Sequence, residues 1–423
     1  MTNEPVRSAT DASVVTASGN PARASSHPGT PSEVLRVFLK LGVSCFGGPI
    51  AHIGYFREEF VVRRRWLDEQ AYIDLVALCQ FLPGPASSQV GFSIGLMRGG
   101  YLGGLAAWTG FTLPSAIMLV LFAYGASALS GAIGTGLLHG LKLVAVAIVA
   151  QAVWGMARTL CPDRERASIA VVAALIILFS TSSVAQIGAI AIGGVAGLWL
   201  CRGAAAPPPG GHMILPVSRT GGLIALGAFF VLLGGLPILR SLWLAPGVAL
   251  FEAFYRSGAL VFGGGHVVLP LLRQAFVAPG WISDNTFLAG YGAAQAVPGP
   301  LFTFAAYLGT VVSPSPHGVP GAVLGLIGIF LPGILILLGT LPFWDNFRKR
   351  AGAQAIMRGV NAAVVGLLAA ALYNPVWTSS VTSRGDFGVA LVAFVLLMVW
   401  RAPPLLVVIV SALGGMVLAL ANG

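Results

Sequence analysis

Two Pro-Gly-Pro triplets are the residues of this sequence whose types and spacing best predict chemistry. The first triplet, Pro83-Gly84-Pro85, is followed by three side chains with hydrogen-bond donors: Ser87, Ser88 and Gln89. Proline and glycine end a helix, and the residues after them can begin a new one. A helix N-terminus presents N–H groups without partners and a partial positive charge, so it attracts anions. We therefore predict an anion site at this break.

The second triplet, Pro298-Gly299-Pro300, stands in a related context. A glutamine lies three residues before each triplet, at Gln80 and Gln295 (295 − 80 = 215). Thr303 is the one hydroxyl residue among the three that follow the second triplet. We expect the second break to bind an anion through the same backbone groups, with fewer side-chain donors.

Glycine pairs mark two further breaks. Phe46-Gly47-Gly48 matches Phe262-Gly263-Gly264 at nearly the same offset (262 − 46 = 216). Glycine lets the backbone approach a ligand closely. A histidine follows each pair, His52 and His266, but the two do not align, which argues against a paired role. The alternative interpretation is that these glycines and prolines serve close helix packing and kinks.

Three cations stand inside apolar segments, where charge is costly and usually functional. Lys40 aligns with Arg256 (256 − 40 = 216), and Lys142 is the one charged residue between Gly99 and Ala157. Lys142 could also extend along the helix to the membrane surface. Cations, helix N-termini and hydroxyl groups together suit a compact, doubly charged anion, whereas a cation site would need carboxylates.

The composition predicts a membrane protein. Of the 423 residues 56% are hydrophobic and 9% are charged, and the mean hydropathy is +0.86. A soluble surface carries about 25% charged residues, so most of this surface must face a lipid bilayer. The net charge is +10, and the basic residues lie in short loops between apolar runs, as topology signals do. The sequence has no basic stripe interleaved with exposed aromatics, so it does not predict nucleic-acid binding. The four cysteines form neither a disulfide framework nor a zinc motif.

The repeated motifs divide the chain into two related halves. We expect a disordered cytoplasmic tail over residues 1–32, a first transport repeat over 33–202, a linker with a connecting transmembrane helix over 203–245, and a second repeat over 246–423. The breaks predict discontinuous or re-entrant helices, because non-helical backbone at membrane depth must be buried in protein or line a cavity.

The basic residues indicate that the second repeat is inverted. Loops 57–65 and 158–166 are basic in the first half, whereas Arg348-Lys349-Arg350 and Arg401 are basic at the complementary positions of the second half. Basic loops face the cytoplasm, so matching loops lie on opposite sides of the membrane. The fold class predicted is an all-α polytopic membrane protein with two inverted-topology repeats, a common transporter plan.

These motifs, in this order, resemble the chromate ion transporter family in its long two-domain form. The resemblance covers residues 33–423 and rests on Phe46–His52, Phe81–Pro85, Phe262–His266 and Val297–Pro300. It implies export of chromate across the bacterial inner membrane and chromate resistance, with sulfate as a competing or counter-transported ligand. The residues themselves predict the oxyanion class, and only the resemblance names chromate.

Other functions remain open at this stage. Sulfate or related oxyanion uptake is the alternative within transport, and a channel is a weaker one. A membrane enzyme would need a cofactor, and the sequence carries no haem or cluster ligand spacing and no dinucleotide motif. We therefore expect no catalytic residues, no metal and no cofactor. The sequence leaves a homo-oligomer open.

Overall fold

Helices make up the part of the chain that the structure describes. The computed structural model describes residues 29–46, 48–128, 131–180, 183–202, 217–243, 245–262, 265–313, 315–344 and 350–422, and these contain no strand. Six described helices are long and apolar enough to cross a membrane: Ala86–Ala126, Ile133–Leu160, Arg219–Leu242, Gly318–Phe343, Ala351–Ser380 and Pro404–Ala421. The prediction of an all-α polytopic membrane protein is confirmed. The expected tail lies almost wholly outside the described residues, as do residues 203–216 of the expected linker segment.

The four predicted breaks interrupt helices in both halves. In the first half they separate α1 (Pro31–Ser44) from α2 (Gly48–Phe56), and α3 (Glu69–Phe81) from α4 (Ala86–Ala128). In the second half they separate α9 (Pro246–Ala259) from η2 (Gly265–Val267) and α10 (Val268–Phe276), and α11 (Asp284–Ala296) from η3 (Leu301–Thr303) and α12 (Phe304–Val311). α4 is itself two segments, because Gly99 and Gly100 leave helical geometry.

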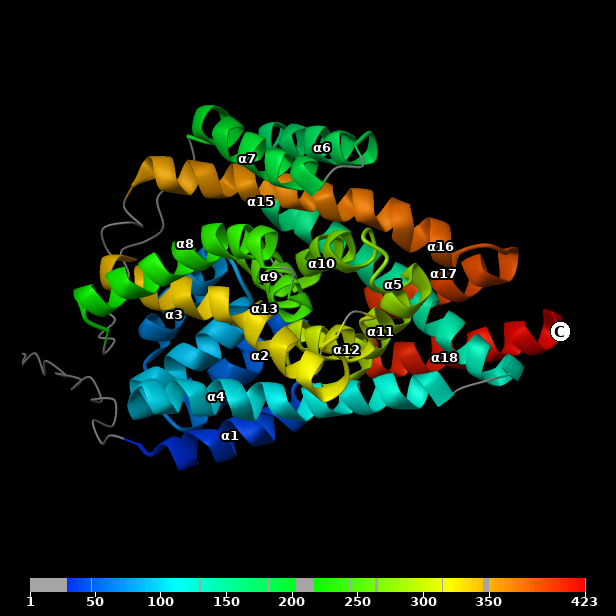
Figure 1. The fold of residues 1–423 in the computed structure, drawn as a ribbon, viewed down its shortest axis with the longest axis horizontal. Coiled ribbons are helices and arrows are strands. Elements are labelled where there is room, and N and C mark those ends of the chain that lie inside the picture. Colours follow the sequence, from blue (N-terminus) through cyan, green and yellow to red (C-terminus); the bar gives the residue numbers. More distant parts are fainter. Residues whose placement is uncertain are drawn as a thin grey trace, which may run out of the picture.

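Longer helices complete each half. They are α5 (Gly131–Leu160), α6 (Arg164–Leu178) and α7 (Ser183–Leu200) in the first half, the connecting helix α8 (Arg219–Leu242), and in the second half α13 (Gly318–Thr340), η4 (Leu341–Phe343), α15 (Ala351–Ala371), η5 (Leu372–Trp377), α16 (Thr378–Ser380), α17 (Arg384–Met398) and α18 (Pro404–Asn422). A π-helical turn (Arg57–Arg63) follows α2. In Figure 1, α4 runs along the long axis of the molecule beside α1, while α6, α7 and α15 lie together along the opposite edge.

The last two helices of each half pack against the other half. α5 of the first half packs on α17 and α18, and α15 of the second half packs on α6 and α7. The helices approach closely at Gly140 and Gly359, where an added Cβ would strike the backbone of the partner helix (359 − 140 = 219). Small residues at such crossings let membrane helices pack backbone to backbone. The halves are therefore interlocked through these helix crossings.

The inverted orientation of the repeats stays a prediction, and surface labelling tests it. Cysteines introduced at Val62 and Arg350, both exposed, should react only with a reagent applied from the cytoplasm, although the two positions are not equivalent in the repeats. A cysteine at Ser241, at the end of α8, is the control and should react only from outside. Labelling of position 350 from outside would return the halves to a parallel arrangement.

Candidate functional site at the crossing of the broken helices

The two Pro-Gly-Pro triplets are joined to the opposite halves by a reciprocal pair of hydrogen bonds. The Gly84 N–H donates to the Val261 carbonyl at 2.7 Å, and the Gly299 N–H donates to the Cys45 carbonyl at 2.8 Å. Cys45 and Val261 are equivalent residues (261 − 45 = 216), each placed directly before a Phe-Gly-Gly motif. All four breaks therefore meet at one place, which we call the crossing.

Each triplet also packs against a proline-containing helix of the other half. A Cβ added at Gly84 would lie 2.9 Å from the Gly333 Cα, next to Pro332 of α13. A Cβ added at Gly299 would lie 2.9 Å from the Ser115 Oγ, next to Pro114 of α4. Both glycines have positive φ, +116° and +95°, which residues with a side chain rarely adopt. Glycine is thus required twice over, by backbone conformation and by space.

Free backbone donors lie at the first triplet. α4 begins at Ala86, as predicted, and the Gln89 N–H makes the first intrahelical bond, to the Pro85 carbonyl at 2.9 Å. The N–H groups of Ala86, Ser87 and Ser88 therefore have no partner within the helix. Pro83, Pro85, Ser87 and Ser88 are buried, so these N–H donors lie inside the protein. There they stabilise a bound anion more than they would in water.

Buried side chains around these donors have unused hydrogen-bonding atoms. His52 is fully buried, its Nδ1 lies 3.4 Å from the Ser87 Oγ, and its ring stands edge-on to Phe111 at 5.1 Å. Three polar atoms of this region are buried without a hydrogen-bond partner in the described chain: His52 Nε2, Ser88 Oγ and Thr112 Oγ1. A buried polar group without a partner costs about 1–3 kcal/mol, so a ligand that supplies the partner is favoured.

The Gln89 amide has another role. Its Nε2 donates to the Pro83 carbonyl at 3.0 Å and to the Gly333 carbonyl at 2.8 Å, so both N–H bonds are occupied. Gln89 therefore holds the triplet against α13 and has no N–H to offer an anion in this arrangement. This corrects the expectation that it acts as an anion donor beside Ser87 and Ser88.

The second half offers fewer free donors, as expected. The Thr303 hydroxyl donates to the Pro300 carbonyl at 2.7 Å, and the His266 Nδ1 lies 2.7 Å from the Tyr291 hydroxyl. Gln295 keeps a buried Nε2 without a described partner. The buried Gly265 packs against the half-buried Pro49, since a Cβ added at Gly265 would lie 3.3 Å from the Pro49 Cγ. The two Phe-Gly-Gly segments therefore also meet.

Other predicted site residues lie elsewhere or are not described. Gln80 and Lys40 are exposed on α3 and α1, and Phe46 is half-buried. Arg256 pairs with the buried Glu252 at 3.1 Å, and Glu252 also pairs with Arg240. The structure thus assigns neither Lys40 nor Arg256 to the crossing, and their paired role stays a prediction. Gly48 has φ +76° with open space beside it, whereas Gly47, Gly263 and Gly264 lie outside the described residues.

Thr112 and Ser115 are the residues of the crossing that sequence reasoning missed. Both are buried in α4, and the Ser115 hydroxyl donates to the Thr112 carbonyl at 3.1 Å. The signal that could have found them is the repeat of Leu-Pro at Pro114 and Pro332 (332 − 114 = 218), which marks the helix that faces each triplet.

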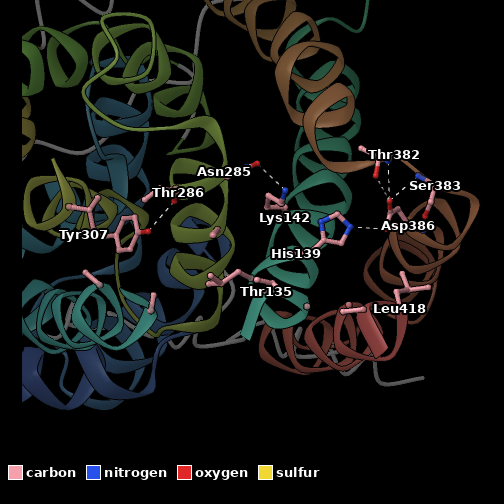
Figure 2. Close-up of a pocket in the computed structure, with 18 of the residues that line it drawn as sticks. Thr135, His139, Lys142, Asn285, Thr286, Tyr307, Thr382, Ser383, Asp386 and Leu418 are labelled. Atoms are coloured by element: carbon pink, nitrogen blue, oxygen red, sulfur yellow. Dashed lines mark hydrogen bonds and ion pairs between the residues drawn. The ribbon is translucent and has the colours of Figure 1, made fainter. Parts of the chain in front are cut away.

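Lys142 lies in a cavity of about 860 Å³, where its Nζ donates to the Asn285 Oδ1 at 3.0 Å (Figure 2). None of the residues of the crossing named above lines this cavity, so the structure places Lys142 apart from the broken helices. The role of Lys142 in binding the substrate stays a prediction.

Comparison with known proteins now decides the family. The sequence model that describes the chromate transporter family matches residues 32–198 and 248–416. The chain belongs to the chromate transporter family. The two matched segments contain all four breaks of the crossing, so the crossing is built wholly from segments that the family model describes.

Curated relatives of the chromate transporter family cover most of the chain. A chromate transport protein of Pseudomonas aeruginosa is 29% identical over 79% of this chain and 78% of its own length. A probable chromate transport protein of Synechococcus elongatus is 28% identical over 91% of this chain and 95% of its own. A chromate transport protein of Cupriavidus metallidurans is 26% identical over 81% and 82%. No solved structure matches the chain.

Proposed function

We propose that this protein exports chromate across the bacterial inner membrane and thereby confers chromate resistance. The observation that carries the proposal is the crossing, where the breaks of both halves meet. Backbone N–H groups of the first half lie there, together with the Ser88 and Thr112 hydroxyls and the His52 Nε2, which are buried and have no partner among the described residues. Such donors suit a compact oxyanion, and relatives named chromate transport proteins supply its identity. Broken helices that meet between two repeats are a recurring design for a substrate site near the middle of the membrane.

Sulfate is the second candidate ligand. Hydroxyl and N–H donors recognise the charge and tetrahedral oxygens of the ligand and not its central atom, so chromate and sulfate compete for the same groups. Sulfate uptake or exchange is the function that this chemistry would also serve.

Flux in everted membrane vesicles tests the direction. Vesicles that contain the protein should accumulate radiolabelled chromate faster than vesicles without it, and excess sulfate should reduce the initial rate several-fold. Repeating the assay with the proton gradient collapsed reports the energy source. Accumulation only in right-side-out vesicles would replace export by uptake, and uptake of sulfate without chromate would replace the substrate.

A further inference from the structure

The cavity that contains Lys142 lies between both halves of the protein. Its walls come from the end of α4, from α5, α11 and α12, and from the beginning of α17 and the end of α18. Figure 2 shows Lys142 and His139 on α5, with Asn285 and Thr286 on one side of them and Thr382, Ser383 and Asp386 on the other. Its volume of about 860 Å³ far exceeds that of a small oxyanion, so the ligand would enter with some of its water.

The carboxylate of this cavity is already satisfied. Asp386 is 3% exposed and accepts hydrogen bonds from the Thr382 N–H and hydroxyl at 3.0 and 2.9 Å and from the Ser383 N–H at 2.9 Å. Its other oxygen lies 2.7 Å from the His139 Nε2. These bonds make Asp386 a fixed part of the wall, since it caps the first turn of α17.

Lys142, in contrast, has a neutral partner. Its ammonium donates to the Asn285 amide oxygen and forms no ion pair with a carboxylate in the part of the chain that the structure describes. An ammonium group has three N–H donors, and a cation on an apolar helix is costly unless something balances it. Thr135, Thr286 and Thr382 line the same space, but the Thr382 hydroxyl is already bonded to Asp386 and the Thr286 hydroxyl to Ser283. A divalent anion would supply both charge and acceptors.

We propose that this cavity is a second anion site, distinct from the crossing, in which Lys142 binds a small divalent oxyanion. The proposal takes its ligand class from the proposed function, but its residues are separate from those of the crossing. Asp386, the carboxylate of the same cavity, keeps its bonds to His139, Thr382 and Ser383, so the bound anion is the group that would pair with the Lys142 ammonium.

The helices packed on α5 present the following charged or titratable residues: Asp284 and Tyr291 on α11, Arg358 on α15, Tyr373 on η5, and Arg384 and Asp386 on α17, with none on α16 or α18. Tyr124 and Tyr307 also line the cavity. Asp284 is held by Arg273 at 2.8 and 3.0 Å, so its charge is balanced.

The cavity lies near the end of α5 that is remote from the basic segment 158–166. α5 has Lys142 towards its beginning and ends at Leu160, next to the basic segment 158–166. If that segment is cytoplasmic, the cavity is an outer vestibule through which an exported anion leaves.

Protection of an introduced cysteine tests this site with sulfate as the probe. Thr135→Cys places a thiol in the wall of the cavity, and Cys161→Ser removes the native cysteine that is not buried. The rate of modification of purified protein by an anionic thiosulfonate is measured against sulfate concentration. We expect sulfate to slow the modification and the protection to saturate as sulfate is raised.

Matched variants decide the outcome. Lys142→Gln should raise the sulfate concentration needed for protection at least tenfold, whereas Arg158→Gln, which removes a cation from the other end of α5, should leave it unchanged. Ser88→Ala, at the crossing, should impair transport and leave protection intact, so the two sites can fail separately. Equal protection in wild type and Lys142→Gln would overturn the proposal, as would a complete lack of protection by sulfate in wild type.

Discussion

Gly84→Val should abolish transport, with less than about 1% of the wild-type flux per folded molecule. Valine at φ +116° is strained by roughly 1–3 kcal/mol, and its Cβ would meet the Gly333 Cα at 2.9 Å. The triplet would move away from α13 and lose the hydrogen bond from the Gly84 N–H to Val261. Because the breaks are joined reciprocally, Gly299→Val should have a comparable effect from the other half. Chromate flux in reconstituted vesicles, divided by the amount of folded protein, measures both.

Two controls separate the crossing from general backbone strain. Gly100→Ala also places a side chain at positive φ, +64°, but has nothing within 4 Å, and Gly54→Ala has neither strain nor a close neighbour. Both should retain most of the flux. If Gly84→Val transports normally, the crossing is not the path of the anion. If the variant folds poorly, Gly84→Ala gives a milder test of the same contact.

Removing the unpaired hydroxyls should weaken chromate binding without loss of stability. A hydrogen bond to a charged group contributes about 1.5–3 kcal/mol, so Ser88→Ala or Thr112→Val should each raise the chromate dissociation constant roughly ten- to a hundredfold. Neither hydroxyl has a partner in the described chain, so its loss leaves no other group unsatisfied, and thermal stability without ligand should stay the same or rise. Shifts in melting temperature with and without chromate measure both quantities.

Ser93→Ala is the matched control for that experiment. Ser93 is fully buried, also lacks a described partner for its hydroxyl, and lies on α4 five residues after Ser88. Its removal should change neither stability nor affinity by much. Equal chromate stabilisation of wild type and Ser88→Ala/Thr112→Val would show that these hydroxyls serve packing, and that the glycines and prolines of the motif do likewise.

The breaks and the repeat could be predicted from the sequence because their causes are local. Proline removes an N–H and glycine weakens a helix wherever they stand, so Pro83–Pro85 and Pro298–Pro300 interrupt helices whatever surrounds them. The scarcity of charge likewise determines that the helices face lipid. A nearly constant offset between motifs is visible without any knowledge of packing. The same offset aligns Cys45 with Val261, the two residues whose carbonyls accept the reciprocal hydrogen bonds.

Which groups meet across the fold was decided by the tertiary structure. Gly84 and Val261 are bonded although the sequence separates them by more than a hundred residues, and nothing local indicates that each triplet joins the opposite half. The donors that a side chain has available also depend on its neighbours. The Gln89 amide has two N–H bonds, and it donates them to the Pro83 carbonyl and to the Gly333 carbonyl of α13. Charge behaves in the same way: Arg256 is balanced by Glu252, whereas Lys142 meets only an amide oxygen among described partners. Residue type sets what a group can do, and packing determines which partner remains for a ligand to supply.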